Sequence, residues 1–213
     1  MPLQALLADV HPAWYAAGGE AGFDPQLVAR ARSSALGQRL LLRALPPSVM
    51  DGLLAPRPGG SPHLSTQRRW PRERVLALVR DLGVLACAPV IRAEVRREPV
   101  RWLRKVLGNS YLLALDRTVW DGRVDRAVQA RLSSEWEALV ADPRFLSDPA
   151  LLGALLDRRG DAELRAWAAR RNRPLADWTL LMRGIEADCA THLPEKAVLR
   201  VASHHENHDE DAA

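Results

Sequence analysis

The stretch that decides the fold runs from Trp70 to Leu115 and reads WPRERVLALVRDLGVLACAPVIRAEVRREPVRWLRKVLGNSYLLAL. Pro71 suits the first position of a helix, and apolar residues then recur every three or four positions, which predicts an amphipathic helix. These apolar positions are Val75, Leu78, Val79, Leu82, Leu85 and Ala86. Gly83 and the small residues 86–88 would let a second helix approach closely. Pro89 is expected to end or kink this element, because it lacks a backbone donor.

The second half of the stretch predicts two further helices. One begins at Pro99 and stops at Gly108, a residue type that commonly follows a helix end. Its apolar positions are Val100, Leu103, Val106 and Leu107. Asn109 or Ser110 can cap the next helix, which begins with YLLAL. The stretch as a whole therefore predicts an all-α fold.

Helical patterns also follow this stretch. The apolar spacing over residues 124–140 predicts an amphipathic helix that Asp142-Pro143 stops. Ser147-Asp148-Pro149 is typical of a helix start and leads into ALLGALL. A separate helix is expected around Leu164, Trp167 and Ala168, ending before Pro174, and another from about Leu175 to Ile185.

Proline and glycine content indicates how the chain is organised. Residues 55–65, APRPGGSPHLS, cannot sustain a helix or a strand ladder. We expect a smaller N-terminal helical lobe over 1–54, an exposed loop over 55–69, a main helical body over 70–203 and a disordered acidic tail over 204–213. The absence of a fixed-period repeat favours a compact domain over a solenoid.

Composition is that of a globular protein. The chain has 213 residues, of which 47% are hydrophobic and 26% charged, so general disorder is not expected. No apolar run approaches the roughly 18 residues of a membrane span, and the N-terminal residues do not resemble a signal peptide. Cys87 and Cys189 lie far apart in the sequence and are expected to be free thiols in a reducing compartment. These features predict a cytoplasmic protein.

No motif for catalysis, phosphate binding or metal binding is present. The chain lacks GxxxxGK[ST], GxGxxG, GxSxG and HExxH patterns. The tail holds His204, His205 and His208 beside Glu206 and Asp209, but a flexible tract lacks the preorganised geometry of a metal site. We therefore expect no catalytic residue, no metal and no cofactor, and hence no enzymatic activity.

Charge and tryptophan content point to an interaction surface. The formal net charge is +4, and basic residues cluster between Arg92 and Lys105. The cluster could be a solvated helix face with local ion pairs, or a patch that meets an acidic partner or nucleic acid. Tryptophan and arginine are common among interface hot spots. The residues that we select on this basis as candidates for protein binding are Trp14, Trp70, Arg92, Arg96, Arg97, Arg101, Trp102 and Arg104.

The same stretch carries a family resemblance. The segment LVRDLGVLACAPVIRAEVRREPVRWLRKVLG resembles the central segment of the YscK/SctK family, the accessory sorting-platform proteins of type III secretion injectisomes. The matching features are Leu82, Gly83, Val84 and Leu85, followed by the pair Ile91-Arg92. A shorter match is HPAWYA at residues 11–16. Residues 117–213 match the family only in length and helical character.

The resemblance implies a cytoplasmic adaptor at the inner membrane. Members of the family link the cytoplasmic domain of the SctD-like inner-membrane ring protein to the SctQ-like pod protein. Through the pod they support recruitment of the SctL-like stator, the ATPase and cargo. We expect the chain to be a monomer on its own, without membrane insertion and without nucleic acid. The alternative that the residues leave open is an arginine-rich helical nucleic-acid-binding or regulatory protein.

Overall fold

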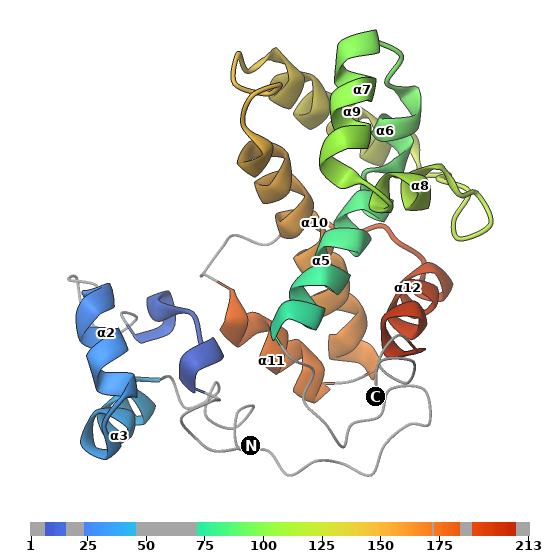
Figure 1. Ribbon diagram of the computed structural model, residues 1–213. Coiled ribbons are helices and arrows are strands. Elements are labelled where there is room, and N and C mark those ends of the chain that lie inside the picture. Colours follow the sequence, from blue (N-terminus) through green and yellow to red (C-terminus); the bar gives the residue numbers. More distant parts are fainter. Residues whose placement is uncertain (1–6, 16–23, 46–71, 172, 184–188, 208–213) are drawn as a thin grey trace. The chain divides into compact units, whose positions relative to one another are not determined.

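A computed structural model describes residues 7–15, 24–45, 72–171, 173–183 and 189–207 (Figure 1). These residues form helices and contain no strand, which confirms the predicted all-α fold. The chain divides into two compact units, Met1–Arg72 with Ala168–Asp188, and Glu73–Trp167 with Cys189–Ala213. The first unit thus includes residues 168–188, which the sequence had assigned to the main helical body. The expected loop over 55–69 lies outside the described residues.

Capping residues and prolines define the helices of the first unit. The 3₁₀ helix η1 (Pro12–Tyr15) precedes α2 (Pro25–Arg32) and α3 (Ala35–Ala44), and α11 spans Arg173–Met182. The Asp24 side chain accepts a hydrogen bond from the amide of Gln26, and Pro25 occupies the first turn of α2. Ser34 caps α3 by accepting from the amide of Gly37 at 3.0 Å. Leu7, Val28 and Leu41 are among the buried side chains of this unit.

The second unit is built around α5 (Arg72–Ala86), whose residues from Leu82 to Ala86 are all buried. The other helices of the unit are α6 (Ala88–Ala93), α7 (Arg97–Leu107), α8 (Ser110–Leu115), α9 (Arg126–Ala141), α10 (Pro149–Arg171) and α12 (Glu195–Asn207). Helix α6 packs against α8 and α9, and α7 packs against α8. The predicted starts and stops at Pro99, Gly108, Pro143 and Pro149 each lie within two residues of an observed helix end.

Two glycines set the crossing of α5 and α10. A Cβ atom at Gly83 would lie 1.9 Å from the carbonyl oxygen of Leu156, and one at Gly160 would lie 1.8 Å from that of Val79. The two backbones are therefore in direct contact, at the point where the α5 and α10 ribbons cross in Figure 1. This confirms the prediction that Gly83 admits a close neighbour.

Two sequence-based expectations about helix limits are wrong. The ALLGALL segment and the segment around Leu164 belong to one continuous helix, α10, instead of two. Helix α12 also continues through His204 to Asn207, where the sequence suggested a disordered tail. Its last turn is held because His205 contacts Asp81 at 2.9 Å and Arg74 donates to the carbonyl oxygen of His205. Residues 208–213 lie outside the described residues.

Candidate functional site

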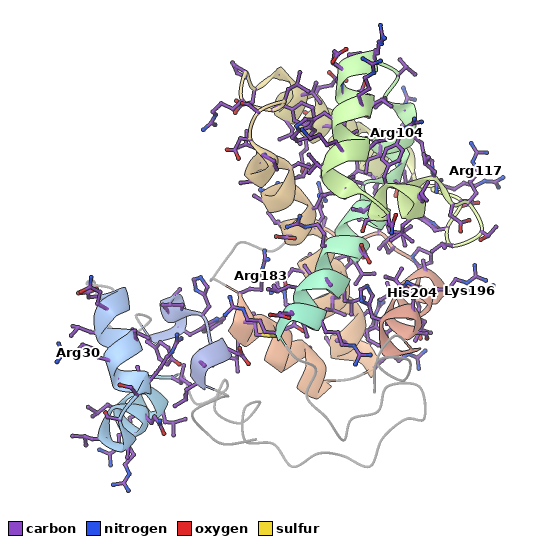
Figure 2. All side chains as sticks on the ribbon, viewed as in Figure 1. Arg30, Arg104, Arg117, Arg183, Lys196 and His204 are labelled. Carbon is purple, nitrogen blue, oxygen red and sulfur yellow. The ribbon has the colours of Figure 1, made fainter. Side chains whose placement is uncertain are left out.

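Helix α7 presents a basic face. One side of this helix is buried through Pro99, Leu103 and Leu107. The opposite side carries exposed cations at positions 97, 101, 104 and 105, with Glu98 as its one exposed carboxylate. We call Arg97, Arg101, Arg104 and Lys105 the α7 basic face; Arg104 is labelled in Figure 2.

The contacts of the α7 basic face leave its charge accessible. Arg101 lies 3.8 Å from Glu98 in an ion pair whose two side chains are both more than half exposed. Such surface pairs are weak, since water and salt screen them. The Arg104 guanidinium lies 5.6 Å from the centre of the Tyr111 ring, a cation–π contact that orients the side chain without neutralising it. A negatively charged partner can therefore still reach these arginines.

Arg92, in contrast, is a structural residue. Its Nε donates to the carbonyl oxygen of Ala114 at 2.6 Å, and its two Nη atoms donate to those of Trp120 and Asp121 at 2.8 and 2.7 Å. These bonds tie the end of α6 to α8 and to the segment that follows it. Because each of its three nitrogens donates to a backbone carbonyl oxygen, Arg92 is a poor candidate for docking.

Arg96 also has a fixed partner. It donates from Nε and Nη2 to the two carboxylate oxygens of Glu94, at 2.8 and 2.5 Å. The Glu94 side chain is 2% exposed, and it also accepts from Nε1 of Trp136 at 3.2 Å. The bonds from Arg96 lower the pKa of the Glu94 carboxyl to about 2. Arg96 therefore neutralises a buried carboxylate at the turn between α6 and α7.

The candidate tryptophans have different environments. Trp102 is half-buried and packs on Phe145, with ring centres 4.4 Å apart. Nε1 of Trp14 donates to the carbonyl oxygens of Leu180 and Arg183 at 3.1 and 2.8 Å, which ties η1 to the end of α11. Trp70 lies outside the described residues. Of the eight residues that we selected from the sequence for protein binding, Arg97, Arg101 and Arg104 thus lie together on the α7 basic face.

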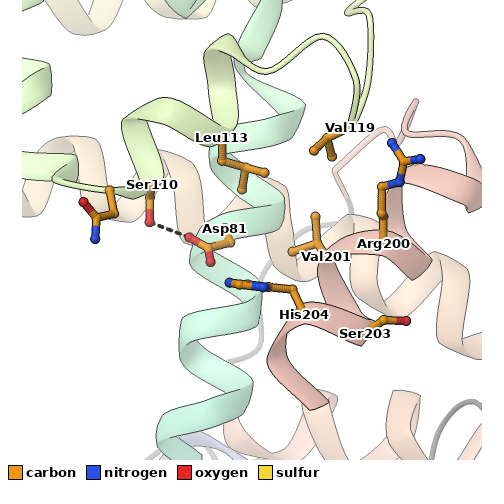
Figure 3. Close-up of a pocket in the computed structure, with 9 residues that line it drawn as sticks. Asp81, Ser110, Leu113, Val119, Arg200, Val201, Ser203 and His204 are labelled. Atoms are coloured by element: carbon orange, nitrogen blue, oxygen red, sulfur yellow. Dashed lines mark hydrogen bonds between the residues drawn. The ribbon is translucent and has the colours of Figure 1, made fainter. Parts of the chain in front are cut away.

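A second feature, which the sequence did not predict, is a half-open cavity of about 530 Å³ in the second unit (Figure 3). It is lined by Asp81 of α5, by residues 109, 110 and 113 at the start of α8 and within it, by Val119, and by residues 200, 201, 203 and 204 of α12. Asp81 is the link between these elements: Oδ1 accepts from the Ser110 hydroxyl at 2.6 Å, and Oδ2 lies 2.9 Å from Nε2 of His205. Positions 196, 200 and 204 are polar and recur every four residues, which would have predicted an exposed face of α12 if residues 204–207 had been recognised as helical.

Polar side chains near this cavity are hydrogen-bonded within the fold. The Ser110 hydroxyl donates to the carboxylate of Asp81, which also contacts His205. Within the described part of the chain, no group of three histidine, cysteine or acidic side chains has the geometry of a metal site. Burial raises the pKa of the Cys87 thiol to about 12, which keeps this sulfur protonated and unreactive at neutral pH.

Comparisons with known proteins found no matching family model, no matching curated protein and no matching solved structure. Among the helices that the structure describes, none combines the length and apolar character needed to cross a bilayer.

Proposed function

We propose that this chain is a non-enzymatic helical adaptor of a type III secretion sorting platform. In this role it would link the SctD-like ring protein to the SctQ-like pod protein at the cytoplasmic face of the inner membrane. The stator and the ATPase would join indirectly, through the pod. The resemblance of the segment around Leu82–Arg92 motivates the assignment, and the observed all-α fold is consistent with it.

The α7 basic face is the observation that carries the proposal. It lies within the segment of the resemblance, and it stands on a helix whose other side is anchored by Leu103 and Leu107. Anchoring matters because a preorganised surface loses less conformational entropy on binding. Arginine suits such a surface, since its planar fork can bind a carboxylate through two parallel hydrogen bonds. The α7 basic face would therefore recognise an acidic surface on one platform partner.

A charge-reversal experiment tests this role. The double variant Arg101→Glu/Arg104→Glu should keep the helical circular dichroism spectrum and lose pull-down of purified SctQ-like and SctD-like proteins from the same gene cluster. The matched control is Arg123→Glu/Arg126→Glu, which changes the charge equally at two exposed positions outside α7. Retained binding by the α7 variant, or equal loss in the control, would rule out the α7 basic face as the docking surface.

The exposed arginines also keep the nucleic-acid alternative testable. If they bind phosphates, affinity for duplex DNA should fall steeply with salt, with a slope of log affinity against log salt of about −0.9 for each phosphate contacted. An adaptor should instead form a saturable complex of fixed stoichiometry with its protein partner. DNA binding at physiological salt that requires Arg101 and Arg104 would favour the alternative.

A further inference from the structure

The cavity of the second unit forms a groove between α8, α12 and the loop that follows α8; we call it the α8–α12 groove. Its volume of about 530 Å³ falls within the range of roughly 300–1,000 Å³ that is usual for ligand sites. It is half-open to solvent, and Figure 3 shows the side chains that line it. A groove of this kind can receive side chains from an extended or helical segment.

The floor of the α8–α12 groove is apolar. Leu113 of α8, Val119 of the loop and Val201 of α12 line it together (Figure 3). Helix α8 also leaves two large apolar side chains in solvent, Leu112 at 63% and Leu115 at 40% exposure.

Arg200 lines the groove, and further basic side chains are exposed on the same helix and on the loop after α8. The outward face of α12 carries Lys196, Arg200 and His204 at four-residue spacing, and the first and last of these are labelled in Figure 2. Arg200 extends over the loop and donates to the carbonyl oxygen of Thr118, near the exposed carboxylate of Asp116. Arg117 adds a further exposed cation on that loop.

The carboxylate inside the groove, that of Asp81, is held by partners within the fold. Both oxygens of Asp81 are engaged, one by the Ser110 hydroxyl and the other by His205. Among the exposed, described residues of α12 and of positions 116–119 in the loop after α8, the basic side chains of Arg117, Lys196 and Arg200 outnumber the acidic side chain of Asp116. A carboxylate arriving from solvent therefore meets a mainly basic edge above an apolar floor.

We propose that the α8–α12 groove binds an acidic amphipathic segment of a partner protein. Apolar side chains of the segment would rest on Leu113, Val119 and Val201, and its Asp or Glu side chains would contact Lys196 and Arg200. This surface lies on other helices than the α7 basic face. The inference does not depend on the proposed function and holds for any biological role of the chain.

Peptide selection tests the chemistry of the occupant. A random-peptide library displayed on phage is selected against the full-length chain, and the consensus peptide is labelled for fluorescence anisotropy. The selected sequences should combine Asp or Glu with Leu, Ile, Phe or Met. A selection that yields no binder, or yields basic or purely apolar sequences, would overturn the proposal.

Variants of the groove then locate the binding site. Ser203 is exposed and lines the groove, so Ser203→Trp should fill the groove without changing its charge. The affinity for the labelled peptide should then fall by about tenfold or more. Ser134→Trp, at an exposed position of α9, is the matched control and should bind as the parent chain does. Lys196→Glu/Arg200→Glu should also lose binding, whereas Arg97→Glu/Lys105→Glu on α7 should not.

Two readouts separate loss of the site from loss of the fold. Thermal unfolding of Ser203→Trp should match that of Ser134→Trp, since both positions are exposed. In the parent chain, peptide should protect the amides of residues 110–119 and 197–205 from hydrogen exchange. Unchanged affinity in Ser203→Trp, or protection that appears on α7 instead, would show that the groove is not the binding site.

Discussion

The contact between α5 and α10 predicts that Gly160→Ala destabilises the second unit, although alanine is the better helix former. A Cβ at position 160 would lie 1.8 Å from the carbonyl oxygen of Val79 and 2.6 Å from the amide nitrogen of Gly83, and real Cβ atoms essentially never come within 3.0 Å. Both neighbours are backbone atoms, which cannot rotate away. The two helices must therefore separate by more than an ångström.

The size of the effect follows from two opposing terms. Replacing glycine by alanine inside a helix gains about 1 kcal/mol. Forcing extra volume into a packed core usually costs about 1–3 kcal/mol, and contact with rigid backbone places this site at the upper end or beyond. We therefore expect Gly160→Ala to lower the free energy of unfolding by about 1–3 kcal/mol in net terms. Urea unfolding followed by circular dichroism measures this change.

Gly153 of the same helix provides a matched control. A Cβ there would meet Arg80 Nη2 at 3.2 Å, a side-chain atom that Asp157 also binds but that needs to move by only a few tenths of an ångström. Gly153→Ala should therefore be neutral or more stable by up to about 1 kcal/mol. If Gly160→Ala proved as stable as Gly153→Ala, the close crossing of α5 and α10 would be refuted. Gly83→Ala should cost less in the Gly160→Ala background than alone, because the helices are already apart.

Three further predictions concern buried polar and thiol groups. Arg92→Ala should lose about 2–4 kcal/mol of unfolding free energy, since three carbonyl acceptors lose a charged donor; a loss below 1 kcal/mol in urea unfolding would contradict this. The pKa of Glu94 is about 2 in the fold and 4.5 when free, so its stabilisation is complete above pH 4.5 and lost as pH falls toward 2. Glu94→Gln should therefore show a shallower acid-induced loss of stability than the parent chain. In native protein, a thiol reagent should modify the partly exposed Cys189 and not the buried Cys87, and urea should equalise the two; mass spectrometry would show the difference.

The helix boundaries were accessible from sequence because local residues determine them. Proline at the start of α10 and glycine after α7 act through backbone geometry alone, so the expected ends at Pro149 and Gly108 agree with the structure. The apolar spacing of α5 likewise identified buried positions such as Leu78 and Leu82. Signals of this kind need no knowledge of tertiary contacts.

The continuity of α10 was not accessible, because tertiary ion pairs support it. The residues around Gly160 are charged and suggest a break between two helices. In the fold, Asp157 bonds Arg80 at 2.6 Å, and the nearly inaccessible Arg159 pairs with Glu135 at 2.5 Å. Partners on α5 and α9 thus allow a polar stretch to cross the core as a helix. The sequence cannot indicate these partners, since they lie more than twenty residues away.

The basic residues between Arg92 and Lys105 are neighbours in the sequence, but they do not form one exposed basic surface in the fold. The Arg92 guanidinium, at the end of α6, is bound by carbonyl oxygens of α8 and the segment after it, and the Arg96 guanidinium is bound by Glu94. From Arg97 onward, the helical period decides which cations face solvent. Charge reversal at Arg101 and Arg104 should therefore alter binding without altering stability, whereas substitution of Arg92 should do the reverse. Because the two effects are separable, a docking defect at the α7 basic face can be distinguished from a damaged fold.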